Sequence, residues 1–388
     1  MKRLAQFLIL LFGLNIFSVY ILFAQENLNQ IDLEALYAAI QKTPSYKKIL
    51  KGDKTYQQLY EDVKQKIVDT DEKQTFRQLS RLVSAINDNH LGFYRTPDST
   101  IKTVYISLPI NTDSLKKQLQ QKAKNSLEGI YYVGNHEFGL YANGDAHQIV
   151  SLANGVLMAE IFHTPYGGYD LLLYSGKPTP YNLIKNTRLV NGTLLGVPFT
   201  KYKEKKFSIL DKGNENYEFR NLEDQVGYLR LSSFNADNDN IKKSEEFYKT
   251  IQGKLTVRHL IVDLRNNGGG AYKVSQKFIN MLKKYNGEIF ILQNAATVSN
   301  AEQFILALKP LKNVTTLGEQ TKGMITFGSN YGKKVVLPSG RFTFSPTDMN
   351  GIDRELAYES KGVNPDVALD FFKSDWIMQT LEYIKKRP

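Results

Sequence analysis

The residue with the clearest chemical potential is a serine at a strand-to-helix junction. Ser299 follows the apolar run Glu288–Leu292 and precedes Ala301–Leu308, which has helical composition. A hydroxyl at a helix N-terminus faces unpaired N–H groups and the positive end of the helix dipole, and both favour a developing oxyanion. The spacing Ser299-x-x-Glu302 is also that of a capping box, in which both side chains only satisfy helix-end donors. This motif alone leaves a nucleophile and a cap both open for Ser299, whereas Glu302 is expected to be a cap.

A glycine-rich turn precedes this junction in the chain. The apolar run His259–Leu264 predicts a strand buried on both faces. Three consecutive glycines, Gly268, Gly269 and Gly270, follow shortly after it. Glycine permits positive φ and lets a backbone approach a bound group closely. The sequence therefore predicts a turn at the end of this strand that comes close to something bound.

Four short motifs stand in a fixed order over about a third of the chain. They are Asp263–Gly270 (DLRNNGGG), Ser299–Glu302 (SNAE), Gly318–Gly323 (GEQTKG) and Glu359–Asp366 (ESKGVNPD). Together they resemble the S41 family of serine peptidases, the C-terminal processing and tricorn-like proteases. Each motif alone would be weak evidence, but the ordered set is specific.

The resemblance also bears on the base that activates the serine. The processing-protease branch uses a lysine one residue after the second glycine of the third motif, where this chain has Met324. The tricorn-like branch instead uses an upstream histidine. Residues 84–93, SAINDNHLGF, resemble its D-x-H segment and place His90 at that histidine. The match favours the tricorn-like branch, although a histidine just past a helix can also be only a C-cap.

The mechanism implied by this resemblance assigns a role to five residues. Ser299 attacks a peptide carbonyl, His90 takes its proton and returns it to the leaving amine, and Glu359 helps to hold the imidazole. The backbone N–H groups of Gly269 and Asn300 receive the oxyanion. Neither a cofactor nor a metal ion is expected. The implied activity is that of a serine endopeptidase acting on peptide or protein substrates.

Lys322 is the nearest rival to His90 as the base. It lies two positions earlier than the processing-protease lysine would, so the spacing disfavours it. An unperturbed lysine titrates near ~10.4 and a histidine near ~6.5, so a lysine base needs strong desolvation to act at neutral pH. The sequence favours His90.

A non-catalytic protein on the same fold is the alternative from a different functional class. It would be an exported protein that binds a peptide or an apolar ligand, as the retinoid-binding relatives within the family imply. Retention of Ser299, His90 and Glu359 together favours the peptidase, because a pure binder has no need of all three.

The N-terminus has the pattern of a secretory signal peptide. Met1-Lys2-Arg3 is basic, the stretch from Leu4 to Phe23 is mainly apolar, and Ala24 precedes a polar segment. We expect cleavage after Ala24 and export to the periplasm or the medium, with an uncleaved anchor as the alternative. The chain has no cysteine, which excludes a lipobox and disulfide bonds.

Composition is that of a globular protein with a basic surface. Hydrophobic residues make up 42% of the 388, charged residues 23%, and the net charge is +11. The lysines are scattered, without the aromatic and arginine clustering of a nucleic-acid groove, so no nucleic-acid partner is expected. Peripheral association with anionic cell-envelope surfaces stays open.

The fold class indicated is α/β, an S41-type (ClpP/crotonase-like) core of βαβ units with an N-terminal helical segment and an inserted antiparallel β domain. Apolar residues recur at helical spacing up to Asn89, and short alternating runs separated by Asn-Gly or Gly-Asp follow. The inserted domain could be a structural insert or a substrate-selecting module. Lys334–Leu337 and Arg341–Ser345 are expected to form a hairpin. The predicted parts are a signal peptide over 1–24, the helical segment over 25–100, the β-rich domain over 101–221 and the peptidase core over 222–388.

Overall fold

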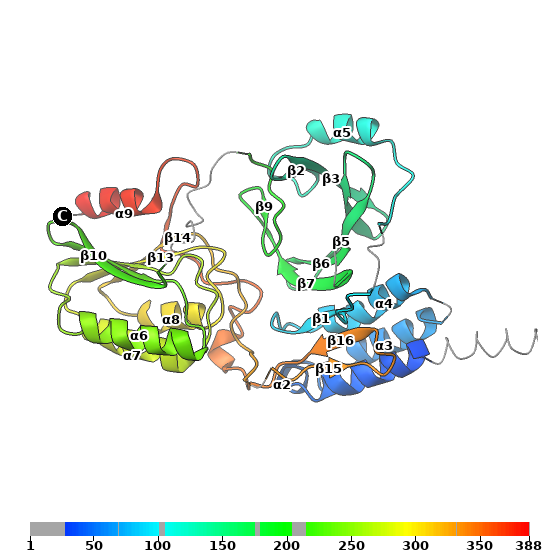
Figure 1. Ribbon diagram of the computed structural model, residues 1–388, viewed down its shortest axis with the longest axis horizontal. Helices are drawn as coiled ribbons and strands as arrows, with labels where there is room; N and C mark the ends of the chain where they lie inside the picture. Colours follow the sequence, from blue (N-terminus) through cyan, green and yellow to red (C-terminus); the bar gives the residue numbers. More distant parts are fainter. Residues whose placement is uncertain are drawn as a thin grey trace, which may run out of the picture.

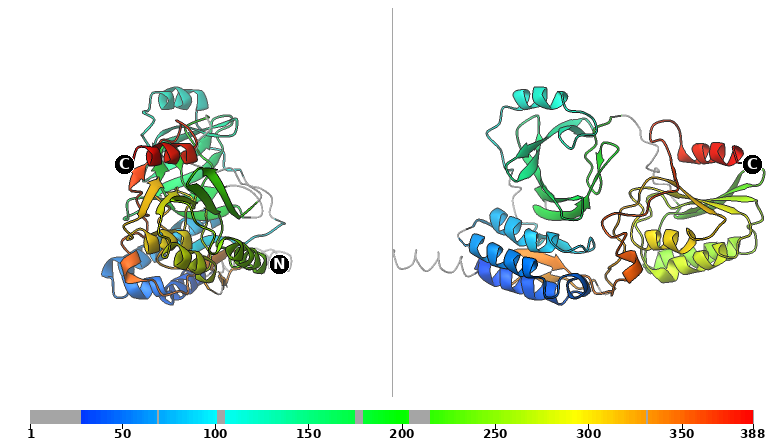
Figure 2. Two further views of the ribbon diagram at one scale, coloured as in Figure 1. Left: turned by 90° about the vertical axis from the view of Figure 1, so that its left-hand side faces the viewer. Right: turned by 180° about the vertical axis from the view of Figure 1, so that it is seen from behind.

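The computed structural model describes residues 28–68, 70–100, 105–174, 179–203, 215–330 and 332–387. The predicted signal peptide lies outside the described residues. Figures 1 and 2 show three parts: a helical part, a β-rich part stacked on it, and an α/β part beside both. This mixed architecture is the α/β class expected from the sequence.

The helical part consists of residues 28–41, α2 (Pro44–Ile49), α3 (Lys54–Lys66) and α4 (Glu72–Ser84). The helices α2, α3 and α4 each begin after a capping residue; the Asp71 carboxylate, for example, accepts the Gln74 N–H at the start of α4. The apolar stripe predicted at helical spacing is buried. Its fully buried members include Leu33, Leu36, Val63, Phe76, Leu79, Leu82 and Ile86. The predicted short helices are therefore confirmed, and α4 ends just before His90.

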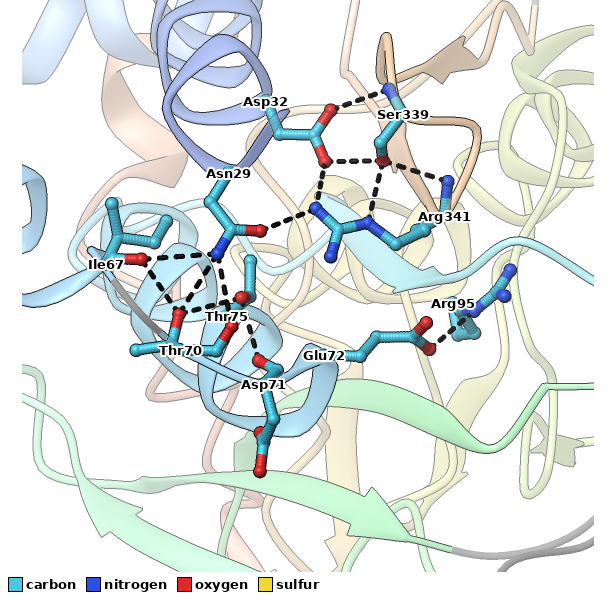
Figure 3. Close-up of polar contacts among 10 residues, drawn as sticks. All are labelled: Asn29, Asp32, Ile67, Thr70, Asp71, Glu72, Thr75, Arg95, Ser339 and Arg341. Atoms are coloured by element: carbon cyan, nitrogen blue, oxygen red, sulfur yellow. Dashed lines mark hydrogen bonds and ion pairs between the residues drawn. The ribbon is translucent and has the colours of Figure 1, made fainter. Parts of the chain in front are cut away.

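A distant hairpin completes this helical part. The expected hairpin forms as β15 (Val335–Val336) and β16 (Phe342–Ser345), and β16 pairs antiparallel with β1 (Gly92–Arg95). Figure 3 shows how the hairpin turn is tied to the first helix. The fully buried Asp32 carboxylate accepts the Ser339 N–H at 2.9 Å.

The β-rich part is a run of consecutive antiparallel strands with one helix. They are α5 (Thr112–Gln120), β2 (Gly129–Val133), β3 (His136–Asn143), β4 (Ala146–Ser151), β5 (Leu157–His163), β6 (Tyr169–Tyr174), β7 (Tyr181–Thr187), β8 (Leu189–Val190) and β9 (Thr193–Leu194). β7 also pairs with β1, which gives a nine-stranded sheet of order β15-β16-β1-β7-β6-β5-β4-β3-β2. The sheet therefore runs from the β-rich part into the helical part without a break.

The α/β part contains a six-stranded sheet of order β10-β11-β12-β13-β14-β17. Its strands are β10 (Tyr217–Glu223), β11 (Val226–Leu231), β12 (His259–Asp263), β13 (Glu288–Gln293), β14 (Val314–Gly318) and β17 (Val367–Ala368), all parallel except β10. The helices are α6 (Asn238–Ile251), α7 (Tyr272–Leu282), α8 (Asn300–Leu308), α9 (Trp376–Lys385) and the 3-10 turn η1 (Asp353–Glu355). The βαβ units expected from the sequence are confirmed.

Helices cover both faces of this sheet. α6, α7 and α8 lie on one face and α9 on the other (Figure 1), and each face has its own apolar core. Trp376 of α9 is fully buried against the second face. Parallel strands end at a common edge, so the segments that follow β12 and β13 meet there. Those segments are the glycine-rich turn and the loop that leads to Ser299.

Candidate active site

Ser299 is held in a strained backbone conformation at the start of α8. Its φ is 56° and its ψ is −120°, a region that non-glycine residues rarely adopt. Such strain persists only where the surrounding structure imposes it, and it clusters at functional sites. The Ser299 N–H donates to the Glu302 carboxylate at 2.8 Å. The hydroxyl is therefore presented on a sharp turn between β13 and α8.

His90 lies next to this hydroxyl although it comes from the other end of the chain. Its Nε2 is 3.1 Å from the Ser299 Oγ. The loop between α4 and β1 carries it, and the Asp88 carboxylate accepts the His90 N–H at 3.1 Å within that loop. Desolvation lowers the pKa of His90 below 6.5, an effect that the negative charge of Asp88 opposes. A neutral imidazole at neutral pH can accept a proton from the serine.

The Asp88 carboxylate lies beside His90, and no role was predicted for it from the sequence. Its second oxygen accepts the Thr347 hydroxyl at 2.7 Å, so the carboxylate is anchored from the hairpin side. The Asp88 side chain is fully buried. Within the described part of the chain, Nδ1 of His90 has no hydrogen-bond partner. The D-x-H pattern was the available signal for Asp88.

Glu359 reaches the backbone around His90, whereas the predicted role had it hold the imidazole. Its carboxylate accepts N–H groups from Asn89 at 2.9 Å, Ile325 at 3.0 Å and Thr326 at 2.8 Å. Burial raises the pKa of Glu359 to about 7, although these three bonds act in the opposite direction. In this geometry Glu359 joins the His90 loop to the segment after Gly323. The two loops are thereby fixed to each other.

Glu302 does more than cap a helix. Besides the Ser299 N–H, its carboxylate accepts the Thr321 hydroxyl at 2.6 Å and the N–H groups of Gly323 at 2.7 Å and Met324 at 3.1 Å. The side chain is fully buried, and desolvation raises its pKa. Glu302 thus links the serine turn to the loop that contains the third motif.

The glycine-rich turn packs directly against the serine. Gly269 has a φ of 81°, and a Cβ there would lie 2.6 Å from the Val298 carbonyl oxygen and 2.9 Å from the Asn300 nitrogen. Only glycine fits this approach. The Gly269 N–H, however, donates to the Asn267 side chain at 2.9 Å. Asn300 begins α8, so its N–H belongs to the first turn, where the helix supplies no acceptor.

Comparison with known proteins agrees with this architecture. Residues 225–369 match the model of peptidase family S41. This matched region, just over a third of the chain, is called the S41 domain below. A curated relative, the chloroplastic C-terminal processing peptidase of Tetradesmus obliquus, is 30% identical over 176 residues, which are 38% of this chain. The match spans 35% of that relative's length.

The matches to two solved structures cover most of this chain. A putative peptidase from Parabacteroides merdae is 14% identical, with 92% of this chain and 95% of that chain covered and a TM-score of 0.42. Mature CPAF is 12% identical, with 93% and 96% covered and a TM-score of 0.47. His90 lies outside the S41 family match, on a segment that the fold brings to the S41 domain.

The Lys322 side chain of the S41 domain forms its hydrogen bond to the β-rich part. Its Nζ donates to the Asn186 carbonyl at 2.7 Å, and the side chain is buried. Desolvation, reinforced by the charge of Arg188, lowers the pKa of Lys322 to about 8. This hydrogen bond connects Lys322 to strand β7 of the β-rich part.

The end of strand β7 contacts both loops of the site, which the sequence analysis did not anticipate. The Lys185 ammonium donates to the carbonyls of Val83 and Ile86, each at 2.9 Å, at the C-terminal end of α4. Arg188 donates to the Lys322 carbonyl at 3.0 Å and also to the Thr321 carbonyl. No local pattern signals these contacts, because they depend on how distant segments pack.

Among the described residues, no three His, Asp or Glu side chains are grouped so that they could hold a metal ion. In the same part of the chain, no helix has both the length and the apolar character needed to cross a membrane.

Proposed function

We propose that this protein is an exported serine endopeptidase in which Ser299 is the nucleophile and His90 its base. The observation that carries the proposal is the 3.1 Å contact between the Ser299 Oγ and the His90 Nε2. That distance is a hydrogen bond between a candidate nucleophile and a candidate base. The two residues are 209 positions apart, so the contact is a product of the fold.

In the proposed reaction the Ser299 Oγ attacks the scissile carbonyl carbon while its proton passes to the His90 Nε2. The imidazolium then gives that proton to the leaving amine as the peptide C–N bond breaks. Water next attacks the acyl-enzyme with His90 again as the base, which releases the acid and regenerates the serine. The negative charge of Asp88 favours the transient imidazolium.

The Asn300 N–H is the stronger of the two proposed oxyanion donors. It lies at the positive end of α8, where a negative charge is stabilised. The Gly269 N–H would have to exchange its bond to the Asn267 side chain for one to the oxyanion. Gly269 remains a proposed donor because a Cβ at this position would lie within 3.0 Å of Val298, Ser299 and Asn300, so its backbone packs against the serine turn.

The choice of base favours the tricorn-like branch. Lys322 donates to a main-chain carbonyl of the β-rich part, and Met324 occupies the position of the processing-protease lysine. Within this proposal Glu359 acts as a positioning residue for the His90 loop through the Asn89 N–H. Export rests on the sequence of residues 1–24 alone, and it would place the substrates among peptides or proteins of the periplasm or the medium.

A fluorophosphonate probe, which reacts covalently with activated serines, tests this function without a known substrate. The purified wild-type protein is expected to be labelled, and the Ser299→Ala variant is not. Losing a capping hydroxyl costs only ~1 kcal/mol, so the variant should stay folded, as circular dichroism can check. Ser114→Ala, on the exposed face of α5, is the matched control and should be labelled like the wild type.

Labelling that persists in Ser299→Ala would contradict the assignment of the nucleophile. A folded wild-type protein that takes no probe, cleaves no peptide, and yet binds peptides would instead support the non-catalytic alternative. The two outcomes are distinguishable in one set of samples.

A further inference from the structure

A cavity of about 310 Å³ lies beside the loop that leads to Ser299, between the S41 domain and the β-rich part. Both parts contribute apolar side chains to its wall. These include Leu194, Leu195 and Val197 from the β-rich part and Ala295, Ala296 and Val298 from the S41 domain. Phe371, ahead of α9, adds an aromatic ring.

The two charged residues of this cavity each form a hydrogen bond within the protein. Glu319 accepts the Ala295 N–H at 2.9 Å, and the Lys322 ammonium donates to the Asn186 carbonyl at 2.7 Å. Both side chains belong to residues that are only 9% exposed. The surface left for a ligand is therefore mainly apolar, and burying an apolar group there is favourable.

The cavity adjoins the proposed nucleophile. Val298 lines the cavity and precedes Ser299 in the chain, and a Cβ on Gly269 would lie 2.6 Å from the Val298 carbonyl oxygen. From the β-rich part, Gly196 lies at ordinary packing distance from the Lys322 Nζ, since a Cβ there would be 3.5 Å from that nitrogen. The two walls of the cavity are thus in contact with each other.

We propose that this cavity holds the side chain of the substrate residue whose carbonyl Ser299 attacks, and that it selects apolar side chains such as leucine, methionine or phenylalanine, since its volume admits an aromatic ring. The assignment rests on the proposed peptidase function. In that reaction the leaving amine takes its proton from His90, so the leaving side of the substrate runs past the His90 loop. No described residue from 84–93 lines the cavity, so we assign it to the acyl side of the scissile bond.

This role makes the β-rich part a specificity element. Residues from 190 to 197 supply apolar side chains to one wall, and the S41 domain and Phe371 supply the others. A mismatch of one methylene in an apolar pocket changes discrimination by about tenfold or more. Changes in the wall should therefore alter the preference for one substrate position.

A peptide library randomised around the scissile bond, read by mass spectrometry, tests the proposal. The wild type is expected to cleave after leucine, methionine or phenylalanine at least about tenfold better than after aspartate or lysine. Ala296→Phe should narrow the cavity and shift the preference about tenfold away from phenylalanine and toward smaller side chains. Leu195→Ala should enlarge it and shift the preference toward tryptophan. Ala142→Phe makes the same change at an exposed site in β3 and should leave the preference unaltered.

The cavity assignment is overturned if Ala296→Phe and Leu195→Ala both cleave with the wild-type preference on the acyl side. It is also overturned if their preference changes only on the leaving side. Probe labelling of the same samples separates the two proposals. A labelled wild type without an apolar preference contradicts the cavity alone, whereas a wild type that is neither labelled nor active contradicts the proposed function.

Discussion

At the scale of single residues, the site depends on carboxylates that act through the backbone. Glu302 and Glu359 each accept several N–H groups, and together they fix the serine turn, the His90 loop and the loop after Thr321. An ionised carboxylate in low dielectric is costly unless such donors surround it. These two side chains therefore tie together the loops that carry Ser299 and His90, and in the described part of the chain neither is hydrogen-bonded to the imidazole.

Glu359 gives a prediction about stability and pH. Its pKa is raised to about 7 in the folded protein, so between about pH 4.5 and 7 the folded state binds more protons than the unfolded state. The contribution of this group to stability is full below the unfolded pKa and is lost as the pH rises through the folded one. The loss amounts to at most about 3 kcal/mol.

Urea unfolding of the wild type and Glu359→Gln between pH 4.5 and 8 measures this effect. Because glutamine does not titrate, we expect the difference in unfolding free energy between the two proteins to change with pH, with the wild type losing stability relative to the variant. A difference that stays constant over this range would contradict the raised pKa of Glu359.

The sequence predicted the candidate reacting residues, but it did not predict most of the residues that hold them in place by hydrogen bonds. Ser299, His90 and the glycine turn stand in local motifs, and the structure brings them together. The partners of Glu359 could not be predicted, because they are main-chain N–H groups supplied by loops that meet only in the fold. For Asp88 the motif was visible, but its anchor Thr347 lies 259 positions away.

At the scale of elements, strands and helices were easier to predict than their pairing. The hairpin of β15 and β16 has a local turn signal, but its pairing with β1 joins segments about 250 positions apart in register Phe93↔Phe344. Strand β7 likewise pairs with the distant strand β1, and its Lys185 donates hydrogen bonds to carbonyls at the end of α4. Nothing in a single strand specifies which distant edge it joins.

Lys185 in β7 is predicted to position His90. Its buried ammonium caps the C-terminal end of α4, where a cation is favoured by the helix dipole, and the Asp170 carboxylate lies 3.9 Å away. Lys185→Met removes both hydrogen bonds and leaves their acceptors buried, at a cost of about 1–3 kcal/mol each. We expect kcat to fall more than KM changes, because the loop that presents His90 loses its support.

Peptide cleavage kinetics and thermal unfolding of Lys185→Met check this role, with Lys185→Arg as the conservative variant that should recover part of kcat. Lys66→Met is the matched control, since Lys66 forms an exposed ion pair with Asp62 in α3 and such pairs contribute little. A destabilised Lys185→Met protein with wild-type kcat would show that the lysine serves stability alone.

At the scale of the whole molecule, the site is assembled from all three parts. The helical part supplies His90, the S41 domain supplies Ser299, and the β-rich part contacts the loops of both. The apolar cavity lies where two of these parts meet. The S41 domain by itself would therefore lack the proposed base, which lies outside residues 225–369.

The rate at which a fluorophosphonate acylates Ser299, followed as a function of pH, tests the Ser299–His90 pair most directly. The wild-type rate should be constant above neutral pH and fall as the pH drops through the lowered pKa of His90, because the protonated imidazole cannot accept the serine proton. His90→Ala should lose at least about 10²-fold in rate at neutral pH, whereas Lys322→Met should stay within about tenfold of the wild type. An acylation rate unaffected by His90→Ala, together with its loss in a folded Lys322→Met variant, would contradict the account and make the lysine the base.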